Sequence, residues 1–108
     1  HSRGMDSGLA NNIGSGWIVA TQKERGFFYQ NFTLSLLECK SCVGWNWFKY
    51  RDNNPEDLET DPSNRDSNNG IVNSKYEPYT QLLDEMKKIN ENVYAIIDYF
   101  DSKDAAAN

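Results

Sequence analysis

The fold of this chain depends on residues 42–53, which read CVGWNWFKYRDN. Residues 42–48 are nearly all apolar, and such a run is typical of a parallel strand that is covered on both faces in an α/β protein. In an extended segment successive side chains point to opposite faces, so Trp45 and Trp47 share one face and Asn46 lies on the other. This stretch therefore predicts a buried parallel strand whose carboxyl end presents aromatic, amide and charged groups.

A helix is predicted on each side of this strand. The sequence TQKE at residues 21–24 fits a capping box, so the first helix should begin at Gln22 and run to Cys39. Its apolar residues recur at helical spacing and predict one broad apolar face: Phe27, Phe28, Phe32, Leu36 and Leu37. The second helix is predicted over residues 78–100, with Pro78 as its first residue.

The remaining segments are predicted to be irregular. Residues 1–16 are rich in glycine and asparagine and predict a loop, and residues 53–73 predict a long loop dense in Asn, Asp, Pro and Ser. Within that loop, Asn68-Asn69-Gly70 is a turn signal, and residues 70–73 form a short extended return. Residues 102–108 carry no anchoring side chain and are expected to be a disordered tail.

Composition excludes several classes of partner. The 108 residues suffice for one domain, and they carry a formal net charge of −5 without a cluster of Lys and Arg. A surface that follows phosphates is therefore not expected, and nucleic acid is disfavoured as a partner. The longest apolar run is only a few residues, so neither a membrane span nor a signal peptide is visible.

Most candidates for chemistry have simpler explanations. Cys39 and Cys42 form a Cys-x-x-Cys pair, which suits redox chemistry or half of a zinc site, but two buried thiols at a helix-to-strand turn are the preferred interpretation. No metal site is expected, because His1 is the only histidine and the aspartates of residues 52–66 lack the pattern of an EF-hand. Glu24 is explained as a capping residue and Glu38 as a solvated residue of the last turn. No cofactor is predicted.

The group Trp45-Asn46-Trp47 is the best functional candidate. Indole rings stack on the apolar faces of sugars, and neighbouring amide and charged groups can bind hydroxyls. The alternative is that one or both tryptophans simply pack under the helices. The predicted order, helix, strand, helix, leaves a single strand without neighbours, so the chain is expected to be part of a larger α/β protein or to pair with one.

Several motifs together resemble the carboxyl-terminal part of β-agarases of glycoside hydrolase family 50. They are RGMDSG (3–8), GW (16–17), TQ (21–22), RGFFYQNF (25–32), CVGWNWFKY (42–50), GIVN (70–73) and Tyr76. The resemblance implies a retaining enzyme with a (β/α)8 barrel and two glutamates, which cleaves β-1,4 bonds of agarose. Residues 1–101 would then be the last helix-strand-helix part of the barrel, with one parallel strand, two long helices and a long loop.

The resemblance also implies a division of roles. The nucleophile and the acid/base would lie upstream of Arg3, so no catalytic residue is expected here and the chain alone should be inactive. Asn46 stands where a histidine is expected. The predicted substrate-binding residues are Trp47, Asn46, Trp45, Lys49, Asp52 and Asp6, with Trp47 the strongest sugar contact and Trp45 a core residue.

The predicted partners follow from the same resemblance. They are an agarose-type galactan or oligosaccharide, together with the remainder of the barrel or a second copy of this chain. A secreted or periplasmic parent protein is implied. A non-catalytic carbohydrate-binding or assembly module is the alternative function.

Overall fold

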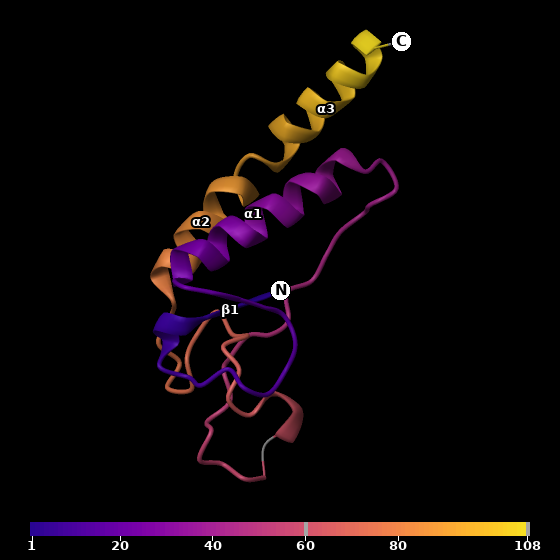
Figure 1. Ribbon diagram of the computed structural model, residues 1–108. Coiled ribbons are helices and arrows are strands. Elements are labelled where there is room, and N and C mark those ends of the chain that lie inside the picture. Colours follow the sequence, from indigo (N-terminus) through magenta and orange to yellow (C-terminus); the bar gives the residue numbers. More distant parts are fainter. Residues whose placement is uncertain (60, 108) are drawn as a thin grey trace.

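The computed structural model describes residues 1–59 and 61–107 of the chain (Figure 1). Its elements follow in the order β1 (Ser2–Gly4), a 3-10 turn (Met5–Ser7), β2 (Trp17–Val19), α1 (Gln22–Glu38), a second 3-10 turn (Pro62–Asn64), α2 (Thr80–Asn90) and α3 (Val93–Ala107). The predicted α/β class is confirmed in this general form, but the predicted single strand is wrong.

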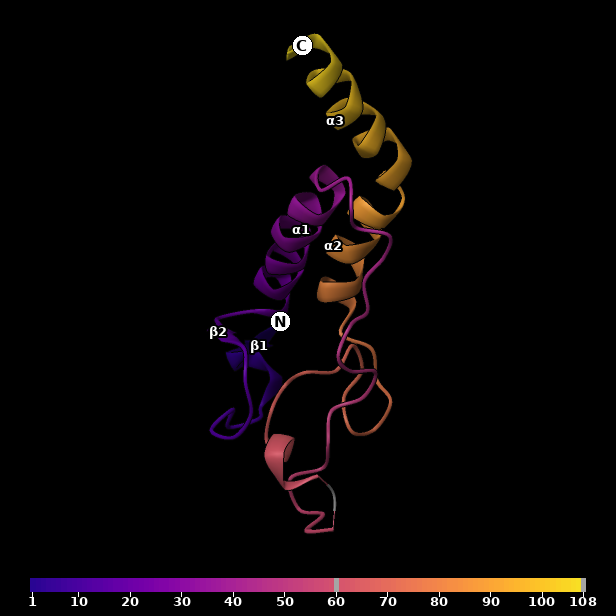
Figure 2. The same cartoon turned by 90° about the vertical axis from the view of Figure 1, so that its right-hand side faces the viewer.

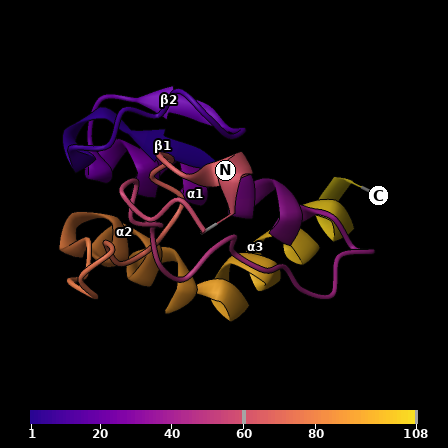
Figure 3. The ribbon, with the colours of Figure 1, turned by 90° about the horizontal axis from the view of Figure 1, so that it is seen from below.

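Helix α1 is the element around which the others pack. The Thr21 hydroxyl accepts a hydrogen bond from the Glu24 amide at 3.1 Å, and the Glu24 carboxylate accepts one from the Ala20 amide at 2.7 Å. The predicted capping box therefore starts the helix where expected. Viewed from below, α1 lies between the two strands and α2 (Figure 3).

The buried face of α1 is not the predicted apolar face. The buried residues are Gln22, Arg25, Gly26, Tyr29 and Thr33. A Cβ atom at Gly26 would lie 2.3 Å from the Glu85 Cβ, so the glycine lets α2 approach closely on this side. In contrast, Phe27 and Phe32 are 42% and 59% exposed. The predicted apolar face of α1, with its stripe of phenylalanines, is therefore left largely open within this chain, because α2 packs over the glycine instead.

Strand β1 lies within residues 1–16, where a loop was expected, and β2 follows directly after them. Strands β1 and β2 pair in parallel, with Ser2 opposite Trp17 and Gly4 opposite Val19. Arg3 holds the intervening loop through donations to the Asn11 and Gly16 carbonyls, both at 2.9 Å. This pairing could not be predicted from the sequence, because three-residue strands are too short for a visible alternation.

Residues 42–48 are extended but do not form a strand. No backbone hydrogen bond joins residues 43–48 to another segment in the described part of the chain. The predicted strand is wrong in this respect, because a strand needs a neighbouring strand for its N–H and C=O groups, and none of the described strands pairs with it. The predicted alternation of faces is nevertheless present, since exposure alternates from Trp45 through Arg51.

The predicted helix over residues 78–100 is two helices. Helix α2 begins at Thr80, and Pro78 instead forms an antiparallel bridge with Val72. The chain leaves the helix after Asn90, and the Asn92 side-chain amide donates to the Lys88 carbonyl at 2.7 Å. Asparagine is a weak helix former that competes for such carbonyl groups, which explains the break.

Helix α3 extends away from the rest of the molecule (Figures 1 and 2). It continues through Ala107, so residues 102–107 of the expected tail are helical, and Asn108 lies outside the described residues. The molecule is elongated, with principal extents of 56, 23 and 20 Å. None of the helices in the described residues is both long and apolar enough to span a bilayer.

The interior is unusually polar. Its buried apolar side chains, among the described residues, are Tyr29, Val72, Leu82 and Ile89. More polar than apolar residues are buried, and large apolar side chains such as Trp17, at 72%, and Phe48, at 49%, are exposed. Apolar surface of this extent marks an interaction surface in a native protein.

Candidate functional site

Residues 45–50 present two different faces. On one face, the Trp45 indole donates to the Tyr29 hydroxyl at 3.1 Å, and the Trp47 indole donates to the Asn69 carbonyl at 3.0 Å. Trp47 also meets the Tyr29 ring edge-on, with 5.8 Å between ring centroids. Asn46, Phe48 and Tyr50 lie on the other face and are exposed. The extended segment is thus attached to α1 through its tryptophans, and its other face stays open.

A small aromatic pocket lies beside this segment. Its volume is about 190 Å³, and its lining residues are His1, Phe28, Tyr29, Phe32, Trp45, Asn46, Trp47 and Phe48. It therefore brings the predicted Trp45-Asn46-Trp47 group together with the phenylalanines of α1. Asn46 is the one non-aromatic side chain in this lining, and the surrounding aromatic rings suit the apolar face of a sugar ring.

Residues 49–52, at the carboxyl end of the extended segment, pair with residues 69–72, at the end of the long loop. The Lys49 amide donates to the Asn69 carbonyl at 3.1 Å, and the Asp52 amide donates to the Val72 carbonyl at 3.0 Å. A Cβ atom at Gly70 would lie 2.5 Å from both the Asp52 nitrogen and the Val72 oxygen. Only glycine allows this approach, so the turn signal at residues 68–70 marks a real contact between the two segments.

The Asp52 carboxylate is the anchor of this contact. It is 1% exposed, and it accepts hydrogen bonds from the Gly70 amide at 2.6 Å, from the Asn68 side-chain amide at 2.9 Å, and from the Tyr79 hydroxyl. Burial and this hydrogen bond to Asp52 raise the pKa of Tyr79. Asp52 therefore joins residues 49–53 to the long loop and to the start of α2.

A buried polar network continues from Asn68 to α1. The Gln22 amide donates to the Asn68 side-chain oxygen at 2.7 Å and to the Asp6 carboxylate at 3.0 Å. Arg25 is fully buried; it donates to the Gln22 side chain at 2.7 Å and to the Gly70 carbonyl at 2.9 Å. The network thus connects the amino-terminal end of α1 to the long loop.

Arg25 is also the centre of an aromatic stack. Its guanidinium carbon lies 5.5 Å from the Trp47 ring centroid and 5.8 Å from that of Tyr79. Burial lowers the pKa of Arg25 to about 10, although the charges of Asp52, Tyr79 and Asp6 oppose the shift. The positive charge remains at neutral pH and holds the two rings in place.

The structure places the six predicted substrate-binding residues in different environments. Asn46 is exposed, and Trp45 and Trp47 are half-buried against α1. The Lys49 ammonium donates to the Asn53 side chain, and partial burial lowers its pKa. Asp6 is exposed but is bonded to Gln22. Asp52 is only 1% exposed in this structure.

The surroundings of the two tryptophans differ. Arg25 and Tyr29 lie against the Trp47 ring, whereas Trp45 lines both the aromatic pocket and a further cavity. Sequence reasoning also missed Gln22, Arg25, Asn68 and Tyr79. Only the turn signal at residues 68–70 could have pointed to the buried polar network, because the other residues of that network are far apart in the sequence.

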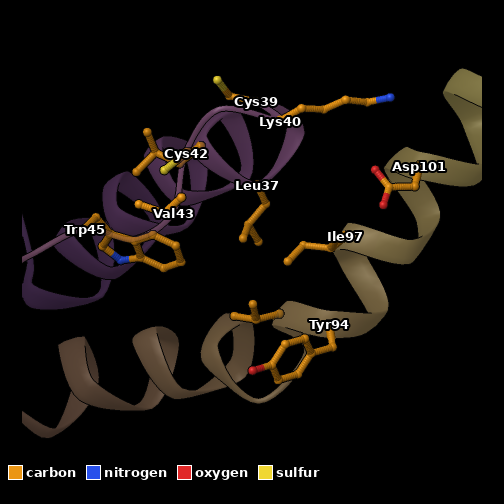
Figure 4. Close-up of a pocket in the computed structure, with 11 residues that line it drawn as sticks. Leu37, Cys39, Lys40, Cys42, Val43, Trp45, Tyr94, Ile97 and Asp101 are labelled. Atoms are coloured by element: carbon orange, nitrogen blue, oxygen red, sulfur yellow. The ribbon is translucent and has the colours of Figure 1, made fainter.

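A second cavity, of about 530 Å³, lies between α1, α3 and the turn at residues 39–43 (Figure 4). Its lining is mainly apolar, with Cys42 and Trp45 on one side and Tyr94 and Ile97 on the other. The described residues contain no group of three or more His, Cys, Asp or Glu side chains that could hold a metal ion.

The comparisons with known proteins agree on one class. No protein-family model matches the chain. Beta-agarase B of Vibrio sp. (strain JT0107) is 34% identical to it over 98 residues, which is 89% of this chain and 10% of that protein. The crystal structure of BpGH50 matches 94% of this chain and 20% of its own, with 46% identity and a TM-score of 0.81. An exo-beta-agarase structure matches 90% of this chain and 13% of its own, with 26% identity and a TM-score of 0.73.

These relatives are carbohydrate-degrading glycoside hydrolases. Within that class, the resemblance of this chain to part of a β-agarase of glycoside hydrolase family 50 is confirmed. The chain spans about a tenth of the curated relative and about a fifth, or less, of the two solved structures.

Proposed function

We propose that this chain is a segment of an agarase-like glycoside hydrolase, in which it forms the last part of a (β/α)8 barrel and contributes sugar-binding residues. The match to BpGH50 over 94% of the chain carries this proposal. The parent enzyme would hydrolyse β-1,4 bonds of agarose or its oligosaccharides. The isolated segment lacks the catalytic glutamates and is inactive.

The uncovered surfaces of the chain support a larger assembly. The backbone groups of residues 43–48 have no partner segment among the described residues, and the phenylalanine stripe of α1 is largely open. The His1 ring lies 6.1 Å from the Phe48 ring, centroid to centroid, so a strand leading into β1 would run beside residues 43–48. A neighbouring barrel strand in that place would satisfy the free backbone groups.

The open face of the extended segment is the best place for substrate in this assembly. Because Trp45 and Trp47 turn toward α1, we assign the direct sugar contact to Asn46, with Phe48 beside it on the open face. Trp47, Lys49, Asp52 and Asp6 then hold the segment and its loops in position. Asparagine donates and accepts hydrogen bonds but carries no proton at neutral pH, so it binds without acting as an acid or base.

The two glutamates of α1 do not form a catalytic pair. Glu24 and Glu38 lie on one helix, and a rise of 1.5 Å per residue separates them by about 21 Å, against about 5–9.5 Å in glycoside hydrolases. The Glu24 carboxylate is also engaged in the helix cap. This geometry supports an inactive segment.

A chimera tests the proposal. Residues 3–101 replace the matching segment of BpGH50, and reducing ends released from agarose are measured for the chimera, for the isolated chain and for their mixture. The chimera should be active and the isolated chain inactive. Replacing Asn46 by Ala in the chimera should raise KM. Replacing the exposed Asp98 of α3 by Asn should leave both KM and kcat unchanged.

Two results would contradict the proposal. One is agarose hydrolysis by the isolated chain that is lost in Glu38→Gln. The other is tight binding of neoagaro-oligosaccharides to the isolated chain, followed by tryptophan fluorescence, which would favour an autonomous binding module instead.

A further inference from the structure

The turn that joins α1 to the extended segment carries two thiols with more solvent access than the sequence suggested. Cys39 is exposed and Cys42 is half-exposed, and both are free. The expectation of two buried thiols is therefore wrong. Buried thiols are inert, whereas accessible thiols exchange with other sulfur compounds, so the possibility of redox chemistry returns.

The backbone brings the two cysteines to opposite ends of one tight turn. The Cys39 amide closes α1 by donating to the Leu36 carbonyl at 3.1 Å, and the Cys42 amide donates to the Cys39 carbonyl at 3.2 Å. A four-residue turn closed by this bond has its end Cα atoms within about 7 Å of each other. Disulfides span Cα separations of about 4.4–6.8 Å, so the turn already has the required backbone form.

The side chains are in an open, reduced arrangement. Figure 4 shows the Cys39 sulfur turned away from the cavity. The Cys42 sulfur lies 3.5 Å from the Gly44 carbonyl oxygen, which is a weak hydrogen bond that is easily exchanged. Closure therefore requires rotation of side chains about their Cα–Cβ bonds, for which the exposed Cys39 has free space.

We propose that Cys39 and Cys42 form a reversible disulfide across this turn, with a small-molecule disulfide such as glutathione disulfide as the oxidant. The Cys39 thiolate attacks one sulfur of the reagent, whose S–S bond breaks and releases one glutathione thiolate. The Cys42 thiolate then attacks the Cys39 sulfur and releases the second. The two protons lost by the cysteines end on the released glutathiones, so two protein thiols become one disulfide and one glutathione disulfide becomes two glutathiones.

The bond would act on the structure at a defined place. It would fix the turn between the end of α1 and residues 43–48, and Cys42 and Cys39 both line the 530 Å³ cavity that this turn shares with α3. The proposal is independent of the agarase-like function, because it uses neither the aromatic pocket nor a sugar.

Mass spectrometry and thiol counting test the proposal on the complete chain. After incubation with glutathione disulfide, the wild type should lose both free thiols, carry no glutathione, stay monomeric and become lighter by two hydrogen atoms. Cys39→Ser and Cys42→Ser are the matched controls, and each should retain one bound glutathione because the second thiol is missing. Retention of glutathione by the wild type, or a disulfide-linked dimer, would overturn the proposal.

A second measurement tests whether the folded turn favours the disulfide, or whether the bond forms only because the two cysteines are close in the sequence. The ratio of closed to open wild type at a fixed glutathione ratio should fall roughly tenfold in denaturing urea, because the folded turn holds the two cysteines in position. An unchanged ratio would show that the fold does not favour the bond and would contradict the inference. Because the assay compares folded and unfolded chain directly, it needs no variant.

Discussion

Replacing Asp52 by Ala is expected to destabilise the chain by about 3–7 kcal/mol. The substitution removes the acceptor of three hydrogen bonds, two of which come from the buried Gly70 and Asn68 groups. A buried donor left without a partner costs about 1–3 kcal/mol, and the loss of the Tyr79 bond adds about 1 kcal/mol. Since whole domains unfold with only about 5–15 kcal/mol, this is a large effect.

Asp52→Asn provides a graded comparison. The amide keeps one acceptor oxygen and the same shape, but its NH2 group must face one of the existing donors, so we expect a cost of about 1–3 kcal/mol. The exposed Asp98→Asn in α3 is the control for the loss of one negative charge and should change stability by less than about 0.5 kcal/mol.

Urea unfolding at 25 °C, followed by tryptophan fluorescence, measures these differences. Trp47 is a suitable reporter because its indole is bonded to Asn69, one residue from both Asn68 and Gly70. If Asp52→Ala costs less than about 1 kcal/mol, the carboxylate is not the anchor described here. In the BpGH50 chimera, a drop in sugar affinity at unchanged stability would instead make Asp52 a substrate contact, as the sequence suggested.

Three further predictions follow from other parts of the structure. Gly26→Ala should cost about 1–3 kcal/mol, because the new methyl group meets the Glu85 Cβ, whereas Gly44→Ala, with no atom within 4 Å of its Cβ position, should be nearly neutral; comparison of the two thermal melts checks this. Thr21→Ala should cost about 1 kcal/mol through loss of the α1 cap, measured as the midpoint shift in urea. Because the pKa of Tyr79 is raised in the folded chain, the Tyr79 hydroxyl loses its proton at a lower pH in the unfolded chain than in the folded one. The contribution of Tyr79 to the free energy of unfolding is therefore present below about pH 10 and falls as the pH rises further. The stability difference between wild type and Tyr79→Phe should therefore shrink above pH 10, and a constant difference would show that Tyr79 does not titrate as described.

Local signals were the most reliable part of the sequence. The capping box placed the start of α1 at Gln22, because the groups that satisfy the first helical amides lie within four residues. The alternation of exposure around Asn46 was also predictable, since it depends only on an extended backbone. The boundary between α2 and α3 could not be predicted, because the helical spacing of apolar residues continues past Asn92. The hydrogen bonds of the helix are nevertheless interrupted there.

The polar network could not have been predicted from the sequence. Asp52, Asn68, Gln22 and Tyr79 are separated by 11 to 57 residues, and nothing in their local surroundings pairs them. Asp52 was expected to contact a sugar, but the approach of two backbones at Gly70 encloses it. The buried face of α1 could not be predicted for a related reason, since Gly26 acquires its importance only when α2 packs against it.

The sequence by itself determined where α1 begins, where the aromatic group of residues 45–47 lies, and which family the chain resembles. These depend on the spacing of neighbouring residues and on the order of motifs along the chain. The tertiary structure alone decided which face of each segment is covered, because burial depends on contacts between residues distant in sequence. It turned the tryptophans toward α1 and left Asn46 open, and it brought Cys39 and Cys42 into solvent at the ends of one turn.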